Sequence, residues 1–247
     1  MAKKALQLEP AQILTFPFQE ENWLKKTLIA SLLVLFSFIP VIPLVLLLGY
    51  AAEIIRGIAV DGKAPSLPEW DDLSSLFTSG FRLFGVGALY MIPSIILIGI
   101  GSLGFMIPII LLEIGMMSEA GAVGFLVAGY IVGFGFIGVG AFVSILTALI
   151  LPVAGTHVVV QEDFRAAFKL REIWAIYKAN WGGFLVAFLI MLGTAVVLYV
   201  GTNFLAATVI LCCLYPFSLY FVRTYLLLIG AGFFGNAYRI SAKNLPG

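Results

Sequence analysis

The longest polar interruption in this apolar chain is residues 157–190, HVVVQEDFRAAFKLREIWAIYKANWGGFLVAFLI. Spacings of three and four residues predict a helix that begins after an N-cap at Asp163 and places Arg165, Lys169 and Glu172 on one face. The other face carries an apolar stripe, made of Ala166, Leu170, Ile173, Trp174, Tyr177 and Trp181. A basic amphipathic helix with Trp and Tyr on its apolar side, followed directly by an apolar run, is typical of a segment that lies along a membrane surface.

The composition of the whole chain places it in a lipid bilayer. Of the 247 residues, 62% are hydrophobic and 11% are charged, whereas roughly a quarter of the residues of a soluble domain are charged. We therefore predict one integral membrane domain over residues 1–247. Its expected fold is all-α, a polytopic transmembrane helical bundle with about six spans in three helical hairpins and with cytoplasmic amphipathic interfacial helices.

The positions of the positive charges predict the orientation of the chain. Thirteen of the fourteen Lys and Arg residues fall in four segments, residues 3–26, 56–82, 165–178 and 239–243. Because cytoplasmic loops carry an excess of Lys and Arg, we expect these segments and both termini on the cytoplasmic side of the cell membrane. All four Trp residues lie in or beside the same segments, which indicates the same orientation independently.

Apolar runs and helix-breaking residues divide the chain into six segments. Residues 1–22 are expected to form an interfacial lead-in, in which Pro10 and Pro17 disfavour a regular helix. Residues 23–58 are read as a first hairpin that turns at Pro40 and Pro43, with a re-entrant loop or one long kinked helix as alternatives. The remaining segments are a cytoplasmic amphipathic loop (59–80), a second hairpin (81–151), a cytoplasmic amphipathic helix (152–181) and a third hairpin (182–238) that turns at residues 201–203.

The returning leg of the second hairpin is rich in glycine, with a GxxxG spacing from Gly129 to Gly133. Small residues let helix backbones approach closely in a bilayer, where burial of apolar surface does not drive association. The pattern predicts a central packing helix, and it favours intramolecular packing over dimerisation.

The sequence offers no catalytic centre, metal site or cofactor site. His157 is the only histidine, and an interfacial hydrogen-bonding role is expected for it. The chain contains no HExxH motif, no Ser/His arrangement with a glycine elbow, no phosphate-binding glycine loop and no Cys/His cluster. We therefore predict that the protein is not an enzyme.

One group of polar residues falls at the edges of the apolar runs. Arg223 is the only Lys or Arg outside the four basic segments, and a charge at the centre of a membrane helix is costly unless it is paired or lines a polar cavity. Glu53 is its candidate partner, although Glu53 is also spaced to pair with Arg56. The alternative is that Arg223 reaches the headgroups by snorkelling. Together these residues define a candidate polar site: Glu53, Arg56, Arg223, Asn236 and Arg239.

Four stretches of the chain resemble a known family. They are FPFQEENWLKK (16–26), GYAAEIIRG (49–57), LPEWDDLSSLFTSGFRL (67–83) and EDFRAAFKLREIWAIYKANWGGFLVAFL (162–189). In this order they are similar to the DUF4013 family of prokaryotic multi-pass membrane proteins, with LPEWDD as the most specific part. The resemblance implies a fold and a location, and it carries no activity or catalytic residues.

Two functional hypotheses follow from these observations. The first is a non-catalytic scaffold or partner-binding subunit of a membrane complex. Its partners would be the lipid bilayer and other membrane protein subunits, with no nucleic acid, and its candidate docking or interfacial residues are Arg165, Lys169, Glu172, Trp174 and Trp181. The alternative is a small permease or channel that uses Glu53, Arg223 and Asn236. The outer halves of the predicted spans are almost wholly apolar, which favours the first hypothesis.

Overall fold

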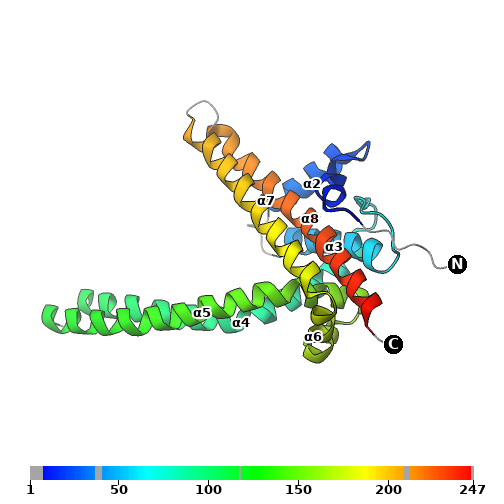
Figure 1. The fold of residues 1–247 in the computed structure, drawn as a ribbon. Helices are drawn as coiled ribbons and strands as arrows, with labels where there is room; N and C mark the ends of the chain where they lie inside the picture. Colours follow the sequence, from blue (N-terminus) through cyan, green and yellow to red (C-terminus); the bar gives the residue numbers. More distant parts are fainter. Residues whose placement is uncertain (1–7, 37–40, 117, 209–211, 246–247) are drawn as a thin grey trace. The chain divides into compact units, whose positions relative to one another are not determined.

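The computed structural model describes residues 8–36, 41–116, 118–208 and 212–245, and within these ranges the chain forms helices and loops without any β-strand (Figure 1). In chain order the elements are α1 (Pro10–Thr15), η1 (Phe16–Phe18), α2 (Trp23–Leu35), α3 (Ile42–Ala59), α4 (Leu73–Glu113), α5 (Glu119–Gln161), η3 (Phe164–Phe168), α6 (Leu170–Ala179), α7 (Trp181–Ala207), η4 (Cys212–Leu214) and α8 (Tyr215–Asn244). The predicted all-α class is confirmed.

Five helices, α3, α4, α5, α7 and α8, are long and apolar enough to cross a membrane among the residues described. The first leg of the first hairpin falls short of this length. α2 has 13 residues, or about 20 Å at 1.5 Å per residue, against a bilayer core of roughly 30 Å. Pro43 stands in the first turn of α3, and Pro40 lies outside the described residues.

The chain divides into two compact units, whereas the sequence predicts one domain. The first unit comprises residues 1–86 and 153–247, and the second comprises residues 87–152. α4 and α5 each contribute to both units.

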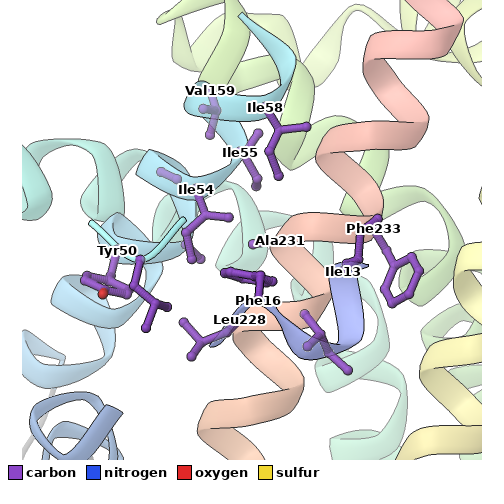
Figure 2. Close-up of a cluster of buried hydrophobic side chains, with 14 of the residues drawn as sticks. Ile13, Phe16, Tyr50, Ile54, Ile55, Ile58, Val159, Leu228, Ala231 and Phe233 are labelled. Carbon is purple, nitrogen blue, oxygen red and sulfur yellow. The ribbon is translucent and has the colours of Figure 1, made fainter. Parts of the chain in front are cut away.

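The core of the first unit forms where α3 and α8 pack together with the lead-in (Figure 2). Ile54 and Ile58 of α3 and Leu228 of α8 are almost completely buried. Ile13 and Phe16, from α1 and η1, are also buried in this cluster. The lead-in is therefore part of the core.

The expectation that Pro10 disfavours a helix is wrong, because Pro10 begins α1. The first N–H groups of a helix have no partner within the helix, so proline costs no hydrogen bond at this position.

The start of α4 packs against α3 at two glycines. A Cβ atom on Gly49 would lie 1.8 Å from the Leu76 carbonyl oxygen, and one on Gly80 would lie 1.8 Å from the Val45 carbonyl oxygen. α4 begins at Leu73, after Asp72 Oδ1 accepts a hydrogen bond of 3.0 Å from the Ser75 N–H, and continues to Glu113. The predicted boundary between residues 80 and 81 is therefore wrong, because Gly80 serves a helix contact and does not end the helix.

In the second unit, glycines bring α4 and α5 into close contact. A Cβ atom on Gly129 would lie 2.2 Å from the Gly104 carbonyl oxygen, and one on Gly133 would lie 2.8 Å from the Gly101 carbonyl oxygen. The structure thus shows the predicted intramolecular packing at the GxxxG spacing. The predicted central position of this helix is not seen within the unit, because most of the side chains of α5 there are exposed.

α5 continues through Pro152 to Gln161, so the second hairpin does not end at residue 151. Proline is tolerated inside transmembrane helices because neighbouring groups satisfy the freed carbonyls. The helix ends before Glu162, whose φ of 54° is not helical.

The predicted single helix over 152–181 is therefore wrong. η3 and α6 are separated at Lys169, which has φ −77° and ψ 64°. The predicted cap at Asp163 is present but starts η3, where Asp163 Oδ1 accepts from the Arg165 N–H at 2.9 Å.

The third hairpin consists of α7 and α8, and its predicted turn is wrong. Residues 201–203 lie inside α7, which ends at Ala207. Thr202 Oγ1 and Asn203 Nδ2 donate to the Tyr199 carbonyl at 2.9 and 2.7 Å, so their polar groups bond within the helix. Such back-bonding lets polar residues remain in a helix where sequence patterns suggest a loop.

Candidate functional site

A buried ion-pair cluster joins the lead-in, α2 and the loop before α4. Lys26 Nζ lies 2.6 Å from Glu20 Oε2 and 2.6 Å from Glu69 Oε1, and it donates to the Leu67 carbonyl at 2.8 Å. The Lys26 side chain is 7% exposed, against 27% for Glu20 and 65% for Glu69. A buried ammonium group is stable only when it is paired and hydrogen-bonded, and here three acceptors surround it.

No local sequence pattern indicates this cluster, and in the sequence Lys26 is only one of the positive charges that flank an apolar run. Glu20, Lys26 and Glu69 lie in three different segments, so no helical or strand period connects them. The usable signal was the pair of acids within the two stretches that resemble the family, FPFQEENWLKK and LPEWDD.

The LPEW stretch is held against α3 by an aromatic pair. The rings of Tyr50 and Trp70 stack with centroids 4.2 Å apart and an interplanar angle of 10°. The Tyr50 hydroxyl donates to the Pro68 carbonyl at 2.8 Å. This part of the family resemblance therefore marks a structural anchor.

Glu53 pairs with Arg56, and Arg56 also pairs with the segment after α5. Arg56 Nη1 lies 2.6 Å from Glu53 Oε1, and Arg56 Nη2 lies 3.0 Å from Glu162 Oε1. All three side chains are partly or largely exposed. Exposed ion pairs contribute little to the stability of the fold, so the main effect of these pairs is to hold the segment after α5 beside α3.

Arg223 does not join this group. Gly235 of α8 lies level with Ile55 of α3, since a Cβ atom on Gly235 would be 3.4 Å from Ile55 Cα. Arg223 precedes Gly235 by 12 residues, or about 18 Å along the helix, which is beyond the reach of its side chain to Glu53. Arg223 is exposed on the surface of the first unit, as a snorkelling arginine would be.

Asn236 and Arg239 lie at two further positions on α8. Asn236 contributes to a small pocket of about 120 Å³ that is lined mostly by apolar side chains of the lead-in, α7 and α8. Its Oδ1 atom is buried and has no hydrogen-bond partner within the part of the chain that the structure describes. Arg239 is buried, with 6% of its surface exposed. The five predicted polar residues are thus spread over separate environments and do not form one site.

His157 is buried and connects α5, α6 and α8. Its Nδ1 atom lies 2.7 Å from the Tyr238 hydroxyl, and its Nε2 atom lies 3.2 Å from Glu172 Oε2. A neutral imidazole that donates from Nε2 to the carboxylate and accepts at Nδ1 from the hydroxyl satisfies both contacts. The predicted hydrogen-bonding role of His157 is therefore confirmed.

Glu172, one of the candidate docking residues, is already paired within the protein, although its side chain is 50% exposed. It accepts from His157 and also lies 3.4 Å from Lys169 Nζ. Desolvation would raise the pKa of the Glu172 carboxyl, but the hydrogen bonds from His157 and Lys169 outweigh it and hold the pKa below its ordinary value of 4.5.

The apolar side of α6 differs from the predicted stripe. Ile173 and Ile176 are the residues that α6 buries, whereas Leu170 and Trp174 are 60% and 56% exposed. Trp181 begins α7 and is also exposed. Arg165 and Lys169 are exposed, as predicted.

The joint between α6 and α7 is held by side chains from both sides. The ring of Trp174 stacks on Tyr177, with centroids 5.9 Å apart, and Tyr177 stacks on Phe184 of α7 at 5.5 Å. Asn180 lies between the two helices and donates from Nδ2 to the Ala237 carbonyl at 3.1 Å. The orientation of α6 relative to α7 is thereby fixed.

No group of three or more His, Cys, Asp and Glu side chains could hold a metal ion among the residues that the structure describes. The polar clusters instead join segments of the first unit to one another. Their chemistry is that of structural ion pairs and hydrogen bonds.

In its described ranges the chain is all-helical, has five helices of spanning length and has polar clusters that tie its segments together. These features define the class of transmembrane helical bundles. More particularly, the chain belongs to the family described as "Protein of unknown function (DUF4013)", which matches residues 32–207, more than half of its length. Comparisons with curated proteins and with solved structures found no match.

Proposed function

We propose that this protein is a non-catalytic scaffold, a partner-binding subunit of a complex in the cell membrane with both termini in the cytoplasm. The supporting observation is the surface of the α4–α5 hairpin in the second unit. Its two helices pack on each other through glycines, and nearly all of their remaining apolar side chains are uncovered.

α5 carries glycines on two opposite faces. Gly129, Gly133 and Gly140 contact α4. A Cβ atom built on Gly124, Gly135 or Gly138 would instead meet nothing within 4 Å among the described residues, apart from its own chain neighbours and helix backbone. At 100° per residue the second set lies on the side away from α4, together with the exposed Ile131 and Phe142.

A glycine inside a helix lowers the stability of the helix by about 1 kcal/mol relative to alanine. Glycines that make no contact within the protein therefore destabilise the helix without a compensating interaction inside the chain. Close approach of a helix from another subunit would account for them, because such contacts in membranes favour small residues. The open glycine face of α5, formed by Gly124, Gly135 and Gly138, is therefore the surface that we assign to a partner.

The permease alternative receives less support. Of its three residues, Glu53 and Asn236 line two different pockets, and Arg223 lies too far along α8 to reach Glu53. A groove of about 440 Å³ between α2, α7 and α8 is lined almost entirely by apolar side chains, among them Leu28, Leu205 and Phe217. Such a groove suits lipid chains and not a polar solute.

The open glycine face is tested by replacing Gly135 and Gly138 with Leu and identifying proteins that copurify from native membranes. We expect loss of a membrane partner without loss of folded yield. Leu at Gly193 of α7, which is equally open, is the matched control. If the variant retains every partner that the wild type has, the proposal is wrong.

The orientation is tested by labelling single cysteines in a chain without Cys212 and Cys213. Cysteines at Lys63 and Lys169 should react only from the cytoplasmic side, and one at Ser118 only from outside. Thr208, which follows the end of α7, is the second external reporter, because Thr202 lies buried in α7. Labelling of the cysteine at position 63 only from outside would contradict the prediction that residues 23–58 form a hairpin.

A further inference from the structure

We propose that the face of α6 formed by Arg171, Trp174 and Lys178 binds the phosphate headgroup of anionic phospholipid. These residues follow one another at spacings of three and four, so they form one stripe on the helix. All three are exposed. The partner-binding function rests on a different helix, so the two proposals are independent.

The stripe has an uncompensated positive charge. Within the described ranges, no carboxylate lies within ion-pair distance of Arg171 or Lys178, whereas the acid of this helix, Glu172, is bound by His157 and Lys169 on another face. Lys178 Nζ lies over the ring of Trp174, 5.3 Å from its centroid. Cations and an indole ring brought together in this way suit a phosphate group at the level of the headgroups.

The position of the stripe relative to the bilayer follows from its link to α7. α7 is a helix of spanning length, and its first residue, the exposed Trp181, is the type of residue that sits at the membrane–water interface. The contacts from Tyr177 to Phe184 and from Asn180 to Ala237 fix α6 beside this entry point.

The exposed side of α6 also contains an apolar component. Leu170 lies beside Trp174 on the helix and is 60% exposed, although the helix buries Ile173 and Ile176 against the protein. An exposed Leu and Trp bordered by Arg and Lys match the interfacial layer, where acyl chains meet charged headgroups. We therefore assign the face to lipid and not to a soluble protein.

The test uses the full chain in vesicles, with Cys212 and Cys213 changed to Ala and a fluorophore on Ala175→Cys, an exposed position next to the stripe. Quenching by brominated phosphatidylglycerol is compared with quenching by brominated phosphatidylcholine. A basic residue near an anionic surface contributes about fivefold in affinity, so Arg171→Gln with Lys178→Gln should reduce the preference for phosphatidylglycerol by about 25-fold. Lys63→Gln with Lys243→Gln removes the same charge elsewhere and should preserve the preference.

Three outcomes would overturn the assignment. One is equal quenching of the wild type by both lipids, and another is an unchanged preference in the Arg171→Gln, Lys178→Gln variant. The third is a fluorophore that neither lipid reaches because a copurifying protein covers it, which would assign the face to a protein.

Discussion

Replacing Lys26 with Met should weaken the first unit more than any change to an exposed lysine. The substitution keeps the length of the side chain but removes the ammonium group that lies 2.6 Å from both Glu20 and Glu69. Glu20, which is 27% exposed, would lose its cation, and the Leu67 carbonyl would lose its donor. Glu69 is 65% exposed and water would replace most of its interaction.

The expected loss follows from these exposures. Hydrogen bonds to charged groups contribute about 1.5–3 kcal/mol, and removing one partner of a fully buried pair costs about 3–5 kcal/mol. Because this pair is only partly buried, we expect about 2–3 kcal/mol, which lowers the unfolding midpoint of a chain of this size by about 5–10 °C.

The measurement is thermal unfolding of the protein in detergent, followed by tryptophan fluorescence. Lys25→Met is the matched control, because Lys25 is exposed and its loss should change stability by less than about 0.5 kcal/mol. Adding Glu20→Gln to Lys26→Met should recover part of the loss, since the unpaired charge disappears. A midpoint for Lys26→Met within about 1 °C of the control would refute the reasoning.

Three further predictions concern other parts of the chain. Gly133→Leu should disrupt the α4–α5 hairpin and lower folded yield, whereas Gly124→Leu should not, and equal yields from the two variants would contradict the packing role assigned to Gly133. Arg223→Leu and Glu53→Gln should have additive effects on stability, because the two residues lie too far apart to pair, and a coupling energy above about 0.5 kcal/mol would show that they interact. Glu172 has a lowered pKa, so its contribution to stability should be complete above pH 4.5 and be lost as the pH falls through the lowered value. Thermal midpoints measured against pH should show this acid-dependent loss in the wild type and a smaller one in Glu172→Gln.

Much of the fold could be read from local patterns. The all-α class and the main helices of the hairpins follow from hydropathy and its period, which act on neighbouring residues. Helix ends were less predictable. Pro10, Pro152 and residues 201–203 look like breaks, yet the first begins a helix and the others lie inside helices. At the start of α1 the missing N–H of Pro10 costs no hydrogen bond, and in α7 Thr202 and Asn203 bond back to the Tyr199 carbonyl.

The candidate site shows the limit of the same reasoning. The His157 contact and the Glu53–Arg56 pair could be predicted from the sequence. His157 is a lone polar group at an apolar edge, and Glu53 and Arg56 have an i, i+3 spacing. The Lys26 cluster was not, since its members come from three segments.

The sequence by itself determined that the chain is helical and apolar enough to span a bilayer, because these properties depend on hydrophobicity summed over one segment at a time. Only the tertiary structure decided which charged side chains are buried in ion pairs and which remain exposed. Lys26 and Arg171 look alike as residues of basic segments, yet one is buried between two carboxylates and the other is exposed on α6. The difference arises because ion pairing and burial depend on distances between segments far apart in the chain, which no local period encodes.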